Sequence, residues 1–347
     1  MRLFDFSNEK IAIDLGTTNT LITCNGKIVV ENPSILAINQ LTGKIMAAGK
    51  DANLMRGKIH KNIKTIYPLK DGMIANFKAA EMMLSSFFKQ VKKRQSFKLS
   101  ASYTMIISIP CGSTDVEIRA VKESVKRLNP NKVLLIPEPV AAAIGSGIDV
   151  LQPRGSMVID IGGGTTEIAV ICMGKIISGQ SVKIAGNMFN ENITAYIRDT
   201  YNLHIGNSTA EKIKISVGAA TQIYKNVPEK ERVRGRDVRT GKPKEIEISH
   251  REIAKSIDQS IQQIESAILE TLATIPPEIS ADIYESGIYL TGGGSMLRGL
   301  DTRLAKTTNL PVCTGIHPLE AVVKGSAMVV KNISQYTTVL VETTQAY

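Results

Sequence analysis

Apolar positions along the chain form short runs typical of strands and longer periodic segments typical of helices. Helical spacing of three or four residues is clearest over residues 251–272, where isoleucines recur on one face. Strand-like runs and helical segments therefore follow one another along the whole chain. The strand-like runs cover residues 9–24, 27–38, 103–110, 133–136, 158–172 and 287–291, and the helical segments cover about 74–93, 114–128, 137–145, 188–201, 209–218, 251–272 and 318–330.

One stretch occurs twice, and the rest of the chain is organised around it. Residues 11–20 read IAIDLGTTNT, and residues 158–167 read VIDIGGGTTE. Each copy contains an apolar strand, an aspartate, a glycine-rich turn with hydroxyl side chains and a second strand, and each continues to a Cys-X-Gly-Lys-Ile sequence. Because there are only two copies, far apart in the chain, the pattern indicates two like-folded halves rather than a solenoid.

The repeated turns have the chemistry of phosphate binding. Glycine lets backbone N–H groups approach an anion closely, and threonine hydroxyls add further donors. Asp14 and Asp160 each end an apolar strand, where a buried carboxylate needs a cation or hydrogen bonds. Mg²⁺ prefers few carboxylates together with waters and substrate phosphate. Two such turns facing each other would clamp a triphosphate with both aspartates near the metal; the alternative is two ordinary hairpins with glycine turns.

Three further stretches carry candidate site residues. Glu138 lies where the strand at 133–136 passes into a helix opened by Pro139, beside the positive end of the helix dipole. Glu211 and Lys214 are three residues apart and therefore share one face of a helix. A third glycine-rich turn at 292–294 follows the strand at 287–291, and its backbone could lie flat against a base or ribose.

Composition narrows the class of protein. A chain of 347 residues with 43% hydrophobic residues predicts a globular protein of two domains. No apolar run approaches the roughly 20 residues that span a bilayer, and the N-terminus lacks the apolar core of a signal peptide. The net charge of +10 permits attraction to an anionic membrane, a nucleic acid or an acidic partner. Because it is spread over many lysines, it favours a general solvated surface, and we expect no specific nucleic-acid partner. Four widely spaced cysteines predict buried, reduced thiols: Cys24, Cys111, Cys172 and Cys313.

Two segments are predicted to be small insertions. In addition, two clusters of apolar residues beside basic ones predict a contact with a membrane. Residues 39–70 look irregular and polar, whereas residues 225–248 predict an exposed hairpin. Apolar residues lie beside basic ones near the N-terminus and again after residue 92, which suits an anionic membrane surface. The alternative is that the second cluster caps the core. The apolar members are Leu3, Phe4 and Phe6 in the first cluster and Phe97 and Leu99 in the second.

The order of these motifs resembles that of the actin/Hsp70/sugar-kinase superfamily, and most closely that of the bacterial actin MreB family. The resemblance rests on residues 14–20, 138–139, 160–167 and 290–294 and extends over roughly residues 9–333. It implies a duplicated α/β ATPase fold of two domains, each with a five-stranded core sheet and a small inserted subdomain. Domain I would comprise residues 1–144 and 316–347, with its insertion at about 32–72, and domain II residues 145–315, with its insertion at about 182–250.

The resemblance also implies roles for individual residues. ATP would bind between the domains, and Asp14 and Asp160 would serve Mg²⁺ through waters. Glu138 would position the attacking water, with Asp160 and Thr165 completing the catalytic set. One phosphate loop would consist of Gly16, Thr17, Thr18 and Asn19, the other of Gly162, Gly163, Gly164 and Thr165; Glu211 and Lys214 would lie on the adenosine side, and Gly292, Gly293 and Gly294 beneath the nucleotide.

The function that the resemblance implies is an ATP-hydrolysing cytoskeletal protein. It would polymerise head to tail into filaments on the inner face of the cell membrane, within the cytoplasm, and support cell shape. Pro137, Asn187 and Asn190 depart from the residues usual in the family, which are acidic, and leave the hydrolysis rate open. A scaffold that hydrolyses weakly or not at all, for shape or motility, is therefore an alternative. A small-molecule kinase is a second alternative, although no inserted lid is visible, and a chaperone would need a peptide-binding domain after the ATPase.

Overall fold

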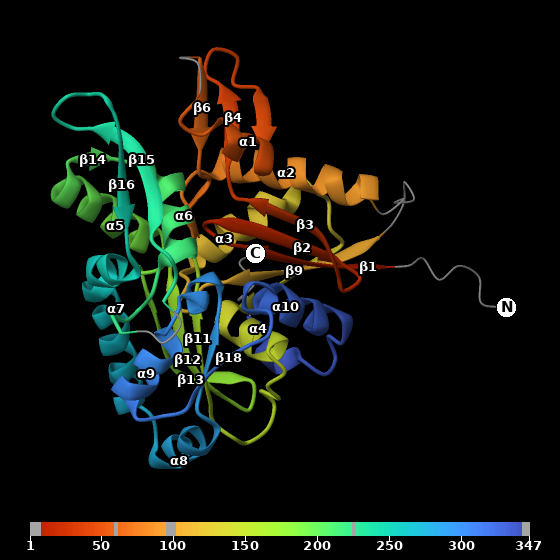
Figure 1. The fold of residues 1–347 in the computed structure, drawn as a ribbon. Helices are drawn as coiled ribbons and strands as arrows, with labels where there is room; N and C mark the ends of the chain where they lie inside the picture. The colour runs from red at the N-terminus through yellow and green to blue at the C-terminus, as the bar shows by residue number, and fades with distance from the viewer. Residues whose placement is uncertain (1–7, 59–61, 95–101, 224–226, 342–347) are drawn as a thin grey trace.

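The computed structural model describes residues 8–58, 62–94, 102–223 and 227–341. Two five-stranded sheets form the centres of two α/β halves (Figure 1). The first sheet has the order β10-β9-β1-β2-β3, in which β1 pairs antiparallel with β2 and parallel with β9. Its strands are β1 (Glu9–Leu15), β2 (Asn19–Cys24), β3 (Lys27–Pro33), β9 (Tyr103–Ile109) and β10 (Lys132–Pro137).

The second sheet repeats this topology in the order β13-β12-β11-β17-β18. Strand β11 pairs antiparallel with β12 and parallel with β17, as β1 pairs with β2 and β9. The two copies of the repeated stretch therefore occupy equivalent positions, as the duplication predicts. The strands are β11 (Ser156–Ile161), β12 (Thr166–Cys172), β13 (Lys175–Val182), β17 (Ile288–Thr291) and β18 (Val312–Thr314).

Two helices connect the sheets at the centre of the molecule. Helix α4 (Glu138–Gly145) leads from β10 towards the second sheet, and α10 (Ala321–Lys331) returns to pack on α4, β1 and β9. The helices approach until their backbones touch, because a Cβ atom added at Gly145 would lie 1.9 Å from the carbonyl oxygen of Ala321. Glycine is therefore required at this crossing, and the central helix pair is tightly packed.

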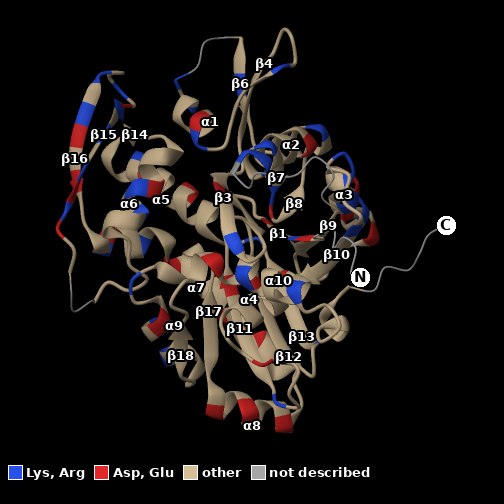
Figure 2. Ribbon diagram, turned by 90° about the vertical axis from the view of Figure 1, so that its right-hand side faces the viewer, with Lys and Arg blue, Asp and Glu red and all other residues tan. Residues whose placement is uncertain are grey.

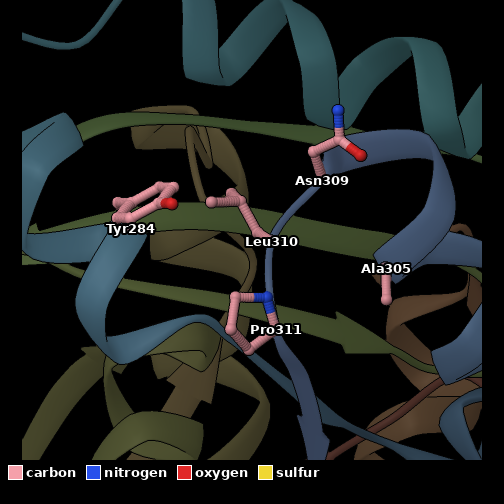
Figure 3. A pocket seen from close by; sticks show the side chains of 5 residues that line it. All are labelled: Tyr284, Ala305, Asn309, Leu310 and Pro311. Atoms are coloured by element: carbon pink, nitrogen blue, oxygen red, sulfur yellow. The ribbon is translucent and has the colours of Figure 1, made fainter.

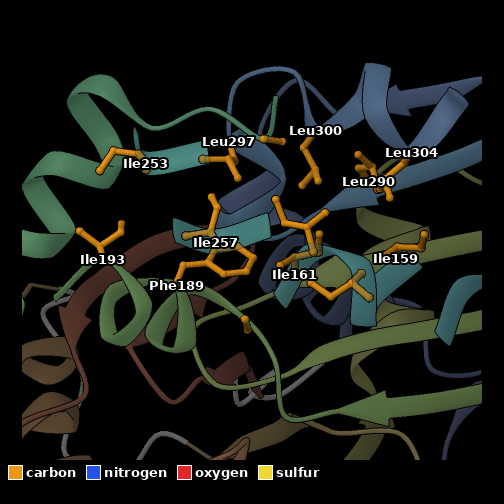
Figure 4. Packing of buried hydrophobic residues seen from close by; sticks show 14 of the residues in the cluster. Ile159, Ile161, Phe189, Ile193, Ile253, Ile257, Leu290, Leu297, Leu300 and Leu304 are labelled. Atoms are coloured by element: carbon orange, nitrogen blue, oxygen red, sulfur yellow. The ribbon is translucent and has the colours of Figure 1, made fainter. Parts of the chain in front are cut away.

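The second half has the larger continuous core, as Figure 4 shows for side chains from β11, α5 and α7. Isoleucines of α7, among them Ile253 and Ile257, are fully buried against Phe189 of α5, as the predicted periodicity requires. The helices of this half are α5 (Gly186–Tyr201), α6 (Asn207–Val217), α7 (His250–Ala273), α8 (Pro277–Ser286) and α9 (Leu300–Thr308), with 3-10 turns at Gly293–Met296 and Pro318–Glu320. In the first half, α2 (Phe77–Arg94) and α3 (Asp115–Lys126) pack against each other, and a short 3-10 turn at Thr337–Val339 lies near the C-terminal end.

Each half carries a small insertion, and one differs from its prediction. Residues 39–70 were expected to be irregular, yet they contribute to a three-stranded sheet and a short helix because Ile35, Ala37 and Ala52 form a small core. This insertion contains β4 (Leu36–Asn39), β5 (Ile45–Ala48), α1 (Lys50–Met55) and β6 (Ile63–Ile66), followed by the two-residue strands β7 (Leu69–Lys70) and β8 (Met73–Ile74). The second insertion includes the predicted hairpin, with β14 (Leu203–His204), β15 (Glu231–Asp237) and β16 (Pro243–Ile248).

Other local predictions have mixed outcomes. Capping boxes begin α3 at Thr114 and α7 at Ser249. Val116 in the first turn of α3 is exposed, whereas Val121 and Val125 of the same helix are buried. The prediction of buried thiols is wrong for Cys313, which is exposed on the edge strand β18; Cys111 and Cys172 are half-buried, and Cys24 is buried. The candidate membrane residues Leu3, Phe4, Phe6, Phe97 and Leu99 lie outside the described residues.

Surface charge is mixed over the face that Figure 2 shows. The hairpin β15–β16 carries both basic and acidic residues, and Arg234 of β15 forms an ion pair at 2.5 Å with Glu245, which lies opposite it on β16. Helix α8 carries acidic residues at the far end of the molecule. Within the described residues, no helix is long and apolar enough to cross a membrane.

Candidate functional site

A cleft between the two sheets contains every site residue that the sequence predicted. It encloses about 610 Å³ and is lined from both halves. The two glycine-rich turns both lie here because β1 and β11, the strands that precede them, both end at this cleft. The predicted residues that line it are Asp14, Gly16, Thr17, Thr18 and Asn19 from the first turn; Glu138; Asp160, Gly162, Gly163, Gly164 and Thr165 from the second; and Glu211, Lys214, Gly292, Gly293 and Gly294.

The two glycine-rich turns face each other at close range. A Cβ atom added at Gly163 would lie 1.8 Å from the hydroxyl oxygen of Thr18, and one added at Gly164 would lie 2.5 Å from that of Thr17. Only glycine permits this approach. Backbone N–H groups and threonine hydroxyls from both halves therefore gather around one small volume, which is the arrangement that an anion of several charges requires.

Asp14 and Asp160 line the cleft from its two halves, and the charge of Asp160 acts on Asp14. Burial, followed by the charge of Asp160, raises the pKa of Asp14 from 3.8 to about 7, against a weak hydrogen bond from Ser108 at 3.4 Å. Burial also raises the pKa of Asp160 to about 6, although the hydroxyl of Thr291 donates to its Oδ1 at 2.8 Å. Without a nearby cation, both carboxylates are costly in ionised form, and a divalent cation between them would offset this cost.

Glu138 lies at the start of α4, at the predicted junction of strand and helix, where it is buried among other acidic side chains. Its pKa is raised well above the ordinary value by burial, then by the charge of Glu167, with smaller contributions from Asp14 and Asp160. Pro139 occupies the first turn of the helix, so Glu138 is held at the junction between β10 and α4. In its ionised form, a carboxylate beside a phosphate site can orient a water molecule and accept its proton.

A polar network forms the third wall of the cleft. The Nζ atom of Lys214 donates to Oε2 of Glu211 at 2.9 Å and to the carbonyl oxygen of Gly186 at 3.0 Å. Asn190 donates to the same Glu211 oxygen at 2.6 Å, which ties α5 to α6. The other carboxylate oxygen of Glu211 and the ammonium group of Lys214 can form hydrogen bonds with the hydroxyls of a sugar. The apolar side chain of Ile215 lies on the same cleft wall.

The structure adds cleft residues that the sequence prediction missed. The N–H of Gly72 donates to the hydroxyl of Thr17 at 2.8 Å, and both Asp71 and Gly72 have positive φ. The Asp-Gly pair signals such a turn, but nothing in the sequence places it against the first glycine-rich turn. Thr18 donates to Oδ1 of Asn187 across the cleft at 3.4 Å, so Asn187 lines the site as well.

The cleft fits a magnesium-bound nucleotide better than a metal ion alone. Among residues 8–58, 62–94, 102–223 and 227–341, no three His, Cys, Asp or Glu side chains are grouped to hold a metal. Asp14 and Asp160 instead provide two buried carboxylates beside a glycine cradle for phosphate. This donor set suits Mg²⁺, which keeps several waters and takes further ligands from phosphate.

Comparison with known proteins identifies the class first. Crystal structures of MreB5 of Spiroplasma citri, bound to AMPPNP and to ADP, superpose with a TM-score of 0.89 and are 34% and 35% identical. The first alignment covers 95% of this chain and 98% of that chain, and the second covers 96% and 99%. The duplicated sheets and facing turns are thus those of the actin-like fold.

Sequence comparison then gives the family. The family model of the MreB/Mbl protein matches residues 8–338. The chain is 41% identical to the cell shape-determining protein Mbl of Bacillus subtilis over 326 residues, covering 94% of this chain and 96% of the relative. It is also 41% identical to the cell shape-determining protein MreB of Escherichia coli over 337 residues, covering 95% of each. The chain belongs to the MreB/Mbl family.

Proposed function

We propose that this protein binds ATP with Mg²⁺ in the central cleft, hydrolyses it and polymerises into filaments of the bacterial cytoskeleton that support cell shape. The observation that carries the proposal is the contact of two glycine-rich turns, one from each half, beside the buried carboxylates of Asp14 and Asp160. The names of its relatives and the nucleotides in the Spiroplasma citri structures support the same reading.

In this proposal, each wall of the cleft has a separate task. The turns at Gly16–Asn19 and Gly162–Thr165 cradle the phosphates through backbone N–H groups and hydroxyls, and the Glu211–Lys214 pair holds the ribose. Glu138 orients the attacking water and accepts its proton. Hydrolysis at a phosphate depends mostly on positioning and on compensation of charge, so these residues suffice without a covalent intermediate.

Asp14 and Asp160 would hold the magnesium ion through its waters. When bound, the ion supplies positive charge that offsets the phosphate and carboxylate charges. The hydrogen bond from Thr291 fixes the orientation of the Asp160 carboxylate, and Ser108 contributes a weaker bond to Asp14. A Cβ atom added at Gly292 would lie 2.6 Å from Oδ1 of Asp160, so glycine leaves space for the carboxylate in this position.

The exposed apolar residues suit head-to-tail assembly. The inserted subdomain around β4–β6 and helix α8 lie at opposite ends of the molecule in Figure 1. The insertion exposes Leu41, Met46 and Leu54, while the other end has a groove of about 470 Å³ between α8 and the end of α9. Figure 3 shows the lining of this groove, which consists of Tyr284, Ala305, Asn309, Leu310 and Pro311.

A contact between two different ends does not close on itself and therefore yields a filament. We propose that the insertion of one subunit occupies the α8–α9 groove of the next. The exposed apolar side chains of the insertion complement this groove, which has Tyr284 exposed on its rim.

Peripheral membrane contact, on the cytoplasmic face, belongs to the same proposal. It rests on the sequence clusters around Phe4 and Phe97, which lie outside the described residues. Each cluster is small, and each basic residue near an anionic surface contributes roughly 1 kcal/mol, so a monomer should bind weakly and a filament firmly. Co-sedimentation with anionic liposomes should fall with salt and in the Phe4→Ala, Phe97→Ala double variant. Equal binding of neutral and anionic liposomes would argue against this surface.

We also propose the division into domains that the sequence resemblance implies. Residues 1–144 and 316–347 would form one domain and residues 145–315 the other, with insertions at about 32–72 and 182–250. The packing of α10 on β1 and β9 supports the assignment of the C-terminal part to the first domain.

The proposed function is tested by sedimentation with electron microscopy. The protein should pellet as filaments with ATP and Mg²⁺ and should release phosphate during assembly. Filaments without phosphate release would indicate a scaffold that does not hydrolyse ATP. A protein that stays in the supernatant with every nucleotide at high concentration would contradict the proposal.

A further inference from the structure

Glu167 is a buried acidic residue whose position the proposed function does not explain. It is the second residue of β12 and is 1% exposed. In the register of the second sheet it lies directly opposite Asp160. The equivalent partner of Asp14 in the first sheet is Leu21, which is also buried. The duplicated fold therefore accepts an apolar side chain at this position, and a carboxylate here requires a reason.

The carboxylate of Glu167 joins the two halves of the molecule. Its Oε2 accepts a hydrogen bond from the backbone N–H of Cys111 at 2.9 Å, and Cys111 belongs to the turn that follows β9 in the first half. Its Oε1 accepts from the hydroxyl of Ser181 at 2.6 Å, within the second half. Through these two hydrogen bonds, one buried carboxyl group ties a loop of the first half to a strand of the second half.

The Cys111 turn lies next to the groups that would act on the phosphate. In the first sheet Ile109 is paired with Pro137, so the chain leaves β9 beside the point where Glu138 begins α4. Pro110 packs on the Gly72 turn, because a Cβ atom added at Gly72 would lie 3.0 Å from its Cγ. The N–H of Gly72 in turn donates to Thr17 of the first phosphate turn. A displacement of the Cys111 turn would therefore reach both Glu138 and Thr17.

We propose that Glu167 is a positioning residue, which fixes the Pro110–Cys111 turn of the first half against the second half and thereby places Glu138 for hydrolysis. Glu167 acts through the Cys111 backbone and through the Thr165 side chain, which also donates a hydrogen bond to it, and not on the substrate. The assignment rests on the proposed ATP hydrolysis for its consequence, whereas the link between the halves can be tested without turnover. Its negative charge also contributes, after burial, to the raised pKa of Glu138, in agreement with their proximity.

The test uses the full-length protein with Glu167→Leu, which introduces the residue that the first half has at this position. Hydrogen exchange of the Cys111 amide, measured by mass spectrometry without nucleotide, should accelerate about tenfold or more, since the hydrogen bond that protects this amide is lost. The strand Tyr103–Ile109 should exchange as in the wild type. With ATP and Mg²⁺, kcat should fall about 10- to 100-fold while KM changes little, because misplacement of a catalytic group affects the chemical step.

Two further variants separate positioning from general packing. Glu167→Gln keeps an oxygen that can accept from Cys111, and it should retain most of the amide protection and of the activity. Ser181→Ala removes only the bond within the second half and should behave as the wild type. Glu167→Ala replaces Glu167→Leu if the leucine variant does not fold.

The outcomes are distinguishable. Wild-type exchange of Cys111 in the leucine or alanine variant would overturn the link between the halves. Altered exchange with unchanged kcat would overturn the positioning role. If Ser181→Ala loses as much Cys111 amide protection and kcat as the leucine variant does, the effect belongs to the packing of β12 on β13, and this result would also overturn the proposal. If the wild-type protein releases no phosphate, the proposed hydrolysis fails, and the exchange of Cys111 alone still decides whether Glu167 links the halves.

Discussion

Replacement of Asp14 by asparagine should make the nucleotide-free protein more stable at alkaline pH. In the folded protein the pKa of Asp14 is raised from 3.8 to about 7, first by burial and then by the charge of Asp160. A raised pKa means that the folded state holds a proton that the unfolded state has released. The resulting stabilisation is fully present below pH 3.8 and is lost as the pH rises through 7.

The size of the effect follows from the same shift. Between the two limits the free energy of unfolding changes by about 4 kcal/mol, at about 1.4 kcal/mol for each pH unit between the two pKa values. Over the accessible interval from pH 5.5 to 8, Asp14 accounts for about 2 kcal/mol of this loss in the wild type. Asparagine has a similar shape and does not ionise, so Asp14→Asn should lack this share of the pH dependence.

The assay is urea unfolding of the nucleotide-free protein at pH 5.5 and pH 8, with Glu270→Gln on the exposed face of α7 as the matched control. At pH 8, Asp14→Asn should be more stable than the wild type without ligand. With Mg²⁺ and AMPPNP the wild type should be the more stable protein, because the cation offsets a carboxylate charge that only the wild type has. The reasoning is refuted if Asp14→Asn shows the wild-type pH dependence, or if ligand stabilises both proteins equally.

Two other variants test separate parts of the account. Glu138→Ala should bind nucleotide almost as the wild type does but should release phosphate about 10²-fold more slowly, because a positioned proton acceptor is removed; turnover at the wild-type rate would assign the water to another group. Tyr284→Lys places a charge on the exposed rim of the α8–α9 groove and should raise the protein concentration needed for pelleting while ATP binding stays unchanged; unaltered pelleting would exclude this groove as a subunit contact.

Much of the fold was predictable because the signals are local. The isoleucine spacing of α7, the capping boxes at Thr114 and Ser249 and the Asp–glycine turns depend on residues close in sequence, and the structure contains each of them. The insertion at residues 39–70 was misjudged, since its core consists of only a few small and apolar residues among many lysines. Exposure of Val116 depends on which face α3 turns to its neighbours, and this is set by tertiary packing.

The composition of the cleft was predictable from the repeat, but its connections were not. A repeated Asp and glycine turn implies two equivalent walls, and the resemblance supplied the residues of the third wall. The approach of Gly72 to Thr17 and the contact between Glu167 and Cys111 join residues 55 and 56 positions apart in sequence, respectively. Both contacts are made by a backbone N–H group, and the local sequence around one partner does not indicate the other.

The most direct test of the central claim, that two glycine-rich turns close on one nucleotide from both halves, is a calorimetric titration of Gly163→Ala with AMPPNP and Mg²⁺. The added Cβ atom would lie 1.8 Å from Oγ1 of Thr18, so the turns must separate. The account predicts one binding site in the wild type, an affinity at least about tenfold weaker in Gly163→Ala, corresponding to about 1.4 kcal/mol, and wild-type affinity in Gly206→Ala, where an added Cβ meets open space. Wild-type affinity in Gly163→Ala would contradict it.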